Sequence, residues 1–267
     1  MEEKKPIEIL ILTGQAGYHS WQLNHKALQD AFINHSMFSS TLVISPGKGE
    51  DMSGFLPDFY VYEVIVLDYE GDDWPEQTRD SFEKFVKDGG GLVIVHGTNN
   101  SFPRWKEFNI MCGLGGWQGR DEKVGPYVYW KDDAFVRDLT PGEAGSHGEQ
   151  EEFDVETRDP EHPIMNGMPA SWRQIKDELY SNLRGPAKNM DILATAYSDR
   201  DTGGSGKHEP VMFTIQYHKG RVFHTVLGHM ADGSGTAMYG KGFRTFLLRG
   251  TEWAATGNVS QAAVQEI

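Results

Sequence analysis

The residues best suited to chemistry in this sequence are histidines and carboxylates that directly follow apolar, strand-like runs. His96 ends the run 89–95 and is followed closely by Asn99 and Asn100. A neutral imidazole at a strand end can act as a general base, bind a metal or donate to a sugar hydroxyl. The alternative is a ring that bonds a neighbouring backbone carbonyl. We favour a functional role, because ligands of open α/β sheets bind at the carboxyl ends of strands.

A second histidine occupies an equivalent position near the C-terminus. His229 follows the apolar run 221–227 through Gly228. The same strand-end argument makes it a candidate base or metal ligand. His224 lies inside that run, and we interpret it as a packed residue.

The segment Asp177-Glu178-Leu179-Tyr180 places two carboxyl groups and a phenol within four residues. An extended backbone would point Glu178 and Tyr180 to the same side, toward one ligand. A carboxylate near two histidines would form an acid/base pair or complete a metal site. The competing interpretation is a solvated acidic pair. We predict His96, Glu178 and His229 as the catalytic residues.

Aromatic and polar residues after other strand-like runs are suited to binding a sugar. His19 and Trp21 follow the first run, and Trp117 lies in a later glycine-rich segment. A sugar stacks its C–H face on an aromatic ring while its hydroxyls make directional hydrogen bonds. The predicted substrate-binding residues are His19, Trp21, Asp68, Tyr69, Asn99, Asn100, Trp117 and Tyr180.

The elements that must position these residues alternate between strand and helix in the first 112 residues. Predicted strands cover 7–13, 40–45, 63–67 and 92–95, and predicted helices cover 23–34 and 75–87. This rhythm is typical of a doubly wound, mainly parallel sheet flanked by helices. An aromatic- and turn-rich insertion follows from about 113 to 190, with a short strand at 152–156. Strands at 191–196, 211–217 and 221–227, a hairpin turn at 218–220 and a helix at 239–255 complete the α/β pattern.

Composition narrows the range of partners and sites. The formal net charge of −14 disfavours binding to nucleic acid or to a membrane surface. The single cysteine, Cys112, excludes an intrachain disulfide and a cysteine-rich metal cluster. No apolar run is long enough to span a membrane, and no signal peptide is evident in the chain as given. We expect a soluble protein, cytoplasmic or, if a leader was removed, periplasmic, with a homodimer as the default assembly.

Taken together, six motifs resemble the ThuA-like family, whose name derives from trehalose utilisation. The resemblance covers about residues 6 to 256. It implies one domain over 1–256, followed by a polar tail over 257–267. The motifs are Gly14-Gln15 with His19 and Trp21, Leu67-Asp68-Tyr69, the run 90–96, His162-Pro163-Ile164, the segment 177–180, and 220–223 leading to Leu227-Gly228-His229.

The resemblance implies the fold of class I glutamine amidotransferases, with a flavodoxin-like sheet. In true amidotransferases a cysteine nucleophile occupies the sharp turn after a central strand and is activated by a later histidine. Here that turn resembles 95–98, which contains His96 and no cysteine, although His229 resembles the later histidine. Amidotransferase chemistry is therefore excluded.

The resemblance further implies a role in sugar catabolism, on a disaccharide, a glycoside or a 3-keto-sugar. One hypothesis is an enzyme that hydrolyses, eliminates or isomerises by acid/base chemistry, with His96 as base, Glu178 as acid and His229 as second base. A second adds a divalent metal such as zinc on His19, His96, Glu178 and His229. A third is a non-catalytic sugar-binding or scaffold module.

Overall fold

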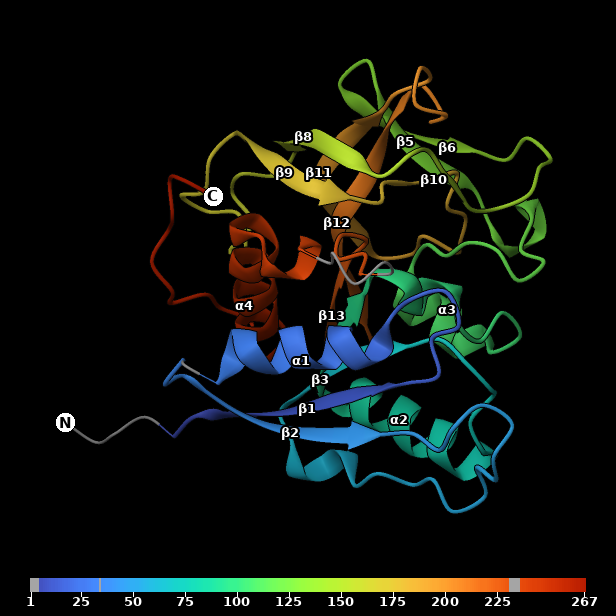
Figure 1. The fold of residues 1–267 in the computed structure, drawn as a ribbon, viewed down its shortest axis with the longest axis vertical. Helices are drawn as coiled ribbons and strands as arrows, with labels where there is room; N and C mark the ends of the chain where they lie inside the picture. The colour runs from blue at the N-terminus through green and yellow to red at the C-terminus, as the bar shows by residue number, and fades with distance from the viewer. Residues whose placement is uncertain (1–4, 34, 231–235) are drawn as a thin grey trace.

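The computed structural model describes residues 5–33, 35–230 and 236–267. Its central feature is one large mixed sheet with helices on both faces (Figure 1). The N-terminal half of the chain, joined by the later strand of residues 220–225, builds one part of the sheet, and the insertion with the other later strands builds the rest. This architecture is the predicted α/β class.

The first part of the sheet is parallel and has flavodoxin-like order. Its strands are arranged β2-β1-β3-β4-β13, and each neighbouring pair is parallel. The order corresponds to the 2-1-3-4-5 arrangement of flavodoxin-like folds, in which ligands bind at the carboxyl edge. The strand bounds are β1 Ile7–Gly14, β2 Phe38–Ile44, β3 Val64–Tyr69, β4 Gly91–Val95 and β13 Gly220–Thr225.

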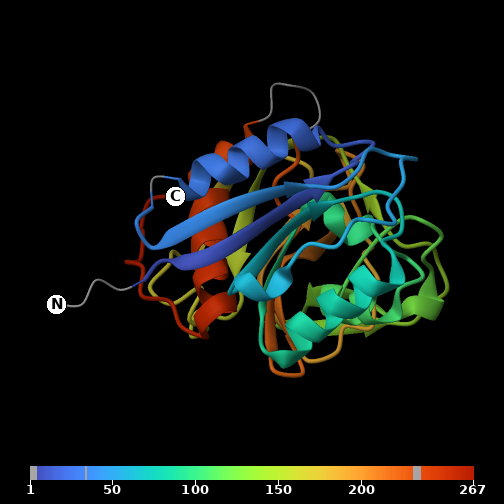
Figure 2. The ribbon, with the colours of Figure 1, turned by 90° about the horizontal axis from the view of Figure 1, so that it is seen from below.

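The inner parallel strands are apolar because helices cover both of their faces. Every residue of β3 and β4 is buried. Helices α1 (Trp21–Phe32) and α4 (Lys241–Thr256) pack on one face, and α2 (Glu76–Asp88) and α3 (Lys106–Cys112) lie on the other (Figure 2). Packing of the sheet between these two layers of helices fixes the positions of the strand ends and of the side chains that follow them.

The second part of the sheet is antiparallel and continues from β13 through β12, β11, β8 and β9. The predicted hairpin joins β12 to β13, and His218 in its turn has a φ of 52°. A short separate pair, β7 with β10, brings the insertion against the segment that follows β9. The bounds are β5 Tyr127–Lys131, β6 Ala134–Asp138, β7 Ser146–His147, β8 Glu151–Thr157, β9 Ser171–Asp177, β10 Tyr180–Ser181, β11 Met190–Ser198 and β12 Lys207–Tyr217.

Several boundaries differ from the sequence-based expectation. Helix α1 ends at Phe32, and residue 34 of the predicted helix lies outside the described residues. The tail after Gly257 folds back on α4, where the Glu252 carboxylate accepts hydrogen bonds from Ser260 and Gln261. Short 3-10 helices cover η1 Phe59–Val61, η2 His96–Asn100, η3 Glu122–Val124 and η4 Ala237–Tyr239.

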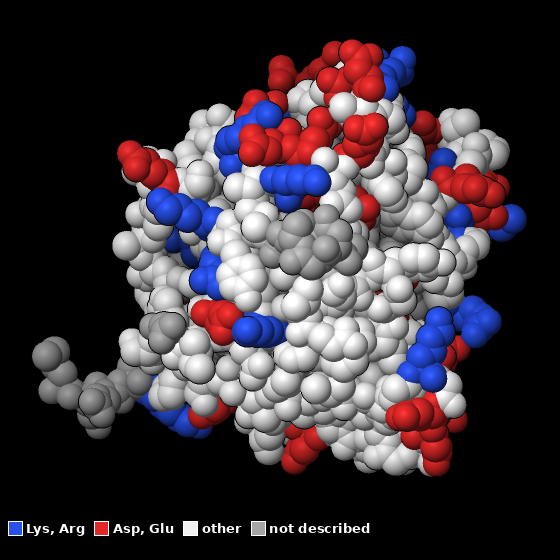
Figure 3. Space-filling model, viewed as in Figure 1, with Lys and Arg blue, Asp and Glu red and all other residues white. Residues whose placement is uncertain are grey.

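Charged side chains on the face of Figure 3 form mixed acidic and basic groups, mostly toward its periphery. Among the residues drawn in colour there, no continuous basic patch of the kind that binds a phosphate backbone is seen. Within the described ranges, every helix is too short or too polar to cross a bilayer.

Glu209 on β12 provides a test of the packing in the antiparallel part. Its carboxylate is buried and accepts hydrogen bonds from Ser205 Oγ at 2.6 Å and from the Tyr127 hydroxyl. Burial raises the pKa of Glu209 from 4.5 to about 7, against the opposing effect of these bonds.

Because the folded-state pKa of Glu209 is raised, its contribution to stability falls as pH rises from about 4.5 to about 7. The free energy of unfolding of Glu209→Gln lacks this pH dependence. Relative to the parent's, we therefore expect it to rise by about 1–3 kcal/mol from the acidic to the neutral end of that window. Urea unfolding at both pH values measures this difference. The exposed Glu149→Gln is the control, and equal pH dependence of the parent and Glu209→Gln would refute the expectation.

Candidate functional site

A cavity of about 590 Å³ lies where the ends of β1, β3, β4 and β13 meet the insertion. We call it the cluster cavity. Its walls combine residues that follow the parallel strands with residues from the segments around β7 and β10. The lining residues are Tyr18, His19, Glu70, Asn100, Trp117, Gln118, His147, Gln150, Glu178, Tyr180 and His229.

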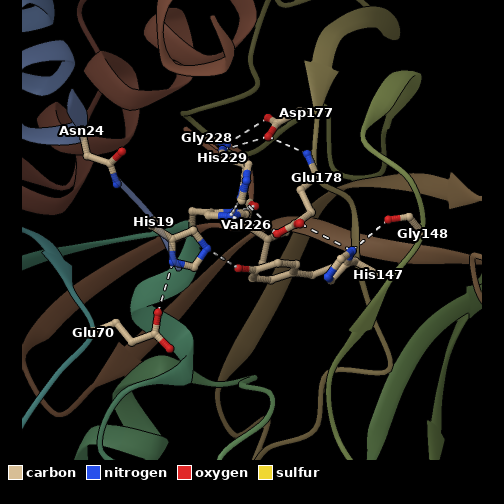
Figure 4. Close-up of polar contacts among 12 residues, drawn as sticks. His19, Asn24, Glu70, His147, Gly148, Asp177, Glu178, Val226, Gly228 and His229 are labelled. Atoms are coloured by element: carbon tan, nitrogen blue, oxygen red, sulfur yellow. Dashed lines mark hydrogen bonds and ion pairs between the residues drawn. The ribbon is translucent and has the colours of Figure 1, made fainter. Parts of the chain in front are cut away.

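Four buried side chains converge beside the cluster cavity, and three of them, His19, Glu178 and His229, line it (Figure 4). One potential ligand atom from each of His19, His96, Glu178 and His229 lies within 4.8 Å of those from the others. The three imidazole rings are nearly perpendicular to one another, with interplanar angles of 76–88° and centroid separations of 4.9–5.2 Å. Rings in this arrangement can direct their nitrogens at one point from three directions. We call these four residues the His3Glu cluster.

His96 occupies the turn directly after β4, with a φ of 41°. A non-glycine residue at positive φ is strained, and such strain is concentrated at functional sites. Its Nδ1 lies 2.6 Å from the Val226 carbonyl oxygen, which can only accept a hydrogen bond. Burial lowers the pKa of His96 to about 4, so the ring is neutral near pH 7 and Nε2 carries a lone pair. That lone pair faces the cluster.

His19 is oriented by a carboxylate on its far side. Its Nδ1 lies 3.1 Å from Glu70 Oε2, so the Nδ1–H donates to this oxygen. In the neutral ring Nε2 then carries the lone pair, and it lies 3.1 Å from the Tyr180 hydroxyl. A carboxylate behind a histidine fixes the tautomer and the orientation of the ring, as is usual for metal-binding histidines.

Glu178 and His229 complete the cluster. Nδ1 of His229 lies 3.1 Å from both Glu178 Oε2 and His96 Nε2. Burial would raise the pKa of Glu178, but the hydrogen bond with His229 and the nearby ring of His96 outweigh this effect and lower the pKa well below the usual range. The cluster therefore combines an ionised carboxylate with imidazole nitrogens.

Asp177 connects the two segments that carry these residues. Its buried carboxylate accepts hydrogen bonds from the backbone N–H groups of Gly228, His229 and Glu178 and from the side chain of Gln174, at 2.8–3.0 Å. Burial raises the pKa of Asp177 to about 6 against the opposing effect of these bonds. Asp177 therefore positions Glu178 and His229 and does not itself line the cavity.

The geometry suits a divalent metal. Glu178 Oε2 lies 3.6 Å from His96 Nε2, so two electron-rich atoms face each other with His229 Nδ1 nearby. Ligands of a tetrahedral ion at about 2.0–2.2 Å lie about 3.3–3.6 Å apart, close to these separations. Three histidines and one carboxylate are also a donor set suited to zinc and other transition metals. Without a metal, the same groups could transfer protons.

The cavity walls carry the groups that could bind a substrate. Trp117 and Gln118 both have positive φ, 50° and 52°, which turns consecutive side chains toward the cavity. Trp117 packs edge-on against Tyr180, with ring centroids 4.7 Å apart. Asn100 is buried, and its Oδ1 has no hydrogen-bond partner among the described residues.

Sequence reasoning did not find His147 and Glu70. His147 lies in a polar part of the insertion and has no histidine at helical spacing. Pairing of β7 with β10 places it opposite Tyr180, with Nδ1 3.4 Å from Glu178 Oε1. Tyr18, Gln118 and Gln150 also line the cavity without having been predicted.

Of the predicted residues, the structure brings seven to this site: His96 in the cluster and, in the cavity lining, His19, Asn100, Trp117, Glu178, Tyr180 and His229. The other four lie elsewhere. Trp21 begins α1 and packs on His25, with ring centroids 5.7 Å apart. Asp68 is buried outside the cavity lining, where its carboxylate accepts hydrogen bonds from the side chains of Thr13 and Asn24.

Tyr69 and Asn99 are also packed away from the cavity lining. Tyr69 stacks on Phe102 at an interplanar angle of 12° and donates to the Asp72 carbonyl. Asn99 is buried beside His224, whose Nδ1 lies 2.8 Å from the Cys112 carbonyl oxygen. His224 thus occupies the packed position expected of it.

Cys112 is unsuited to nucleophilic catalysis. Burial raises the pKa of its thiol to about 12, and Sγ lies 3.1 Å from the Leu114 carbonyl oxygen. The turn that would hold an amidotransferase nucleophile contains His96 instead.

Comparisons with known proteins identify similar chains. The sequence matches the model of the family described as ThuA, trehalose utilisation, over residues 8–254. A ThuA-like protein from Parabacteroides merdae is 51% identical and superposes with a TM-score of 0.94, over 97% of this chain and 93% of that one. A ThuA-like protein from Bacteroides uniformis is 16% identical and shares the fold, with a TM-score of 0.63 over 97% of this chain and 96% of that one. No curated protein matches the chain.

Proposed function

The chain belongs to the ThuA trehalose-utilisation family, and from this premise we propose that it is a metal-dependent enzyme that acts on a glycoside or keto-sugar. The family supports a carbohydrate-related role and leaves the reaction open. The His3Glu cluster is the single observation that carries the proposal. Its four donors lie together, and three of them line a cavity large enough for a small molecule.

The proposal assigns distinct roles to the chain's own residues. His19, His96, Glu178 and His229 would hold the ion, with Glu70 orienting the ring of His19 and the Val226 carbonyl orienting that of His96. A bound divalent ion would polarise a substrate carbonyl or hydroxyl as a Lewis acid. His96 would then be a ligand through Nε2, which is the second of the two roles, base or metal ligand, expected from the sequence.

The walls support binding of a carbohydrate. Trp117 offers an aromatic face, and Asn100, Gln118 and Gln150 offer amide groups to hydroxyls. A 3-keto group acidifies the adjacent C–H, so elimination needs a base that takes this proton and an acid that protonates the departing oxygen, and addition of water to the resulting double bond completes hydrolysis. His147 beside Glu178 is the cavity imidazole outside the ligand set, and it could contact the departing oxygen.

A metal-free enzyme and a non-catalytic sugar-binding module are the alternatives. The first uses Glu178 and the histidines as an acid/base group at the distances described above. The second is favoured by the missing cysteine nucleophile in the turn at His96. Binding without turnover would identify the module.

The experiment compares product formation from disaccharides and their 3-keto forms before and after chelation. We expect the chelated protein to lose at least about 100-fold in rate, and zinc, manganese or another divalent ion to restore it. Turnover that survives complete removal of metal would refute the metal-dependent mechanism and favour the metal-free acid/base enzyme. Binding of the sugars without product in the metal-loaded protein would refute the enzyme assignment.

A further inference from the structure

A second hollow adjoins the cluster cavity and shares part of its wall. This side hollow has a volume of about 370 Å³. Four residues, Tyr18, Glu70, Asn100 and Gln118, line both spaces. The two hollows are therefore neighbours, separated by side chains that face both.

The shared wall is suited to contact a ligand that extends across it. Tyr18 is 83% exposed, so its ring is available at the rim of both hollows. Gln118 is exposed and held at positive φ, a conformation that costs energy and is retained where surrounding structure enforces it. Asn100 Oδ1 is buried and lacks a partner among the described residues.

Beyond this wall the side hollow is polar. Lys48, Asp72, Asp73 and Arg104 contribute to its lining, and Arg104 pairs with Asp73 at 2.8 Å. Paired charges and amides present donors and acceptors to neutral hydroxyls without strongly favouring one ionic charge. Both hollows lie within the range of about 300–1,000 Å³ that is usual for small-molecule sites. Each is therefore large enough to take one sugar ring.

We propose that the side hollow binds the second sugar unit of a glycoside whose first unit lies against the His3Glu cluster. The inference rests on the proposed carbohydrate site and narrows its substrates to disaccharides and longer glycosides. The linking oxygen then lies along the wall formed by Tyr18, Asn100 and Gln118. A monosaccharide or methyl glycoside fills only one of the two hollows.

Gly17 allows a clean test, because it lines the side hollow and is not part of the cluster cavity lining. A Cβ at Gly17 would meet nothing within 4 Å, and its φ is not positive, so the backbone tolerates a side chain. Gly17→Trp should fill the side hollow. Gly54 shares these two properties and lines neither hollow, so Gly54→Trp is the matched control.

Calorimetry measures the binding affinity of each protein for trehalose, lactose and their 3-keto forms. These affinities are compared with those for methyl glucoside and methyl 3-keto-glucoside. We expect the parent and Gly54→Trp to bind their best disaccharide at least about tenfold more tightly than its methyl glycoside. Gly17→Trp should lose that difference and keep its affinity for the methyl glycoside. Equal affinities in the parent, an unchanged ratio in Gly17→Trp, or no binding of any probe would overturn the inference.

Metal content and product formation are measured on the same samples. A parent with the expected affinity ratio but neither metal nor turnover refutes the proposed function and supports the side hollow. Turnover with equal affinities refutes the side hollow alone.

Discussion

Glu178→Ala is expected to lose bound metal almost completely. Replacing a residue that only orients a ligand costs about 10–100-fold in metal affinity, so removal of a ligand should cost more than about 100-fold. His96→Ala should behave in the same way, because its Nε2 faces the cluster. Elemental analysis after gel filtration measures the metal per chain, and turnover of the keto-glycoside should fall with it.

His208 and Glu156 provide the matched control for these variants. Nδ1 of His208 lies 3.6 Å from Glu156 Oε1, the same separation as between His96 Nε2 and Glu178 Oε2, and the pair lines a different hollow. His208→Ala and Glu156→Ala should retain metal and activity. Folded Glu178→Ala protein with parental metal content would show that the cluster is not a metal site.

Asp177→Asn is expected to lower the free energy of unfolding by about 2–4 kcal/mol, because its carboxylate accepts four N–H donors at 2.8–3.0 Å. An amide has one accepting oxygen. Its NH2 group would face N–H donors from which it cannot accept a hydrogen bond. The segments that carry Glu178 and His229 should also separate, with weaker metal binding as a second effect. Denaturant unfolding and a metal titration measure the two effects.

The control is Asp154→Asn on β8, whose carboxylate is exposed and pairs with Arg173 at 3.3 Å. Surface pairs of this kind contribute about 0–1 kcal/mol, so this change should be nearly neutral. If Asp177→Asn and Asp154→Asn were equally stable, the connecting role of Asp177 would be refuted.

The parallel part of the fold could be predicted because buried parallel strands have a strong sequence signal. Residues 64–67 and 91–95 are continuous apolar runs flanked by turns and helices. The antiparallel part has a weaker signal. Strand β9 buries Gln174 and Asp177 alongside Trp172, and buried polar residues conceal the alternation that would reveal a strand.

Part of the site followed from the rule that strand carboxyl ends meet. This rule led to His19, His96 and His229, and extended geometry led to Glu178 and Tyr180. It also led to Asp68 and Tyr69, because the predicted strand ended at residue 67. The strand continues to Tyr69, so both side chains pack within the fold.

His147 illustrates what residue spacing cannot supply. Its position depends on long-range pairing of two-residue strands, Tyr180 with His147 and Ser181 with Ser146. Such short strands have too few residues for a periodic pattern. Glu70 lies in an acidic stretch after β3, where the sequence gives no sign of which carboxylate contacts His19.

The most direct test of the central claim is crystallography of the protein purified without added metal, with diffraction measured on both sides of the absorption edge of the metal found in it. The account predicts one anomalous peak per chain, in contact with His19, His96, Glu178 and His229. A fully ordered cluster without a peak, in protein that turns over sugar, would contradict it.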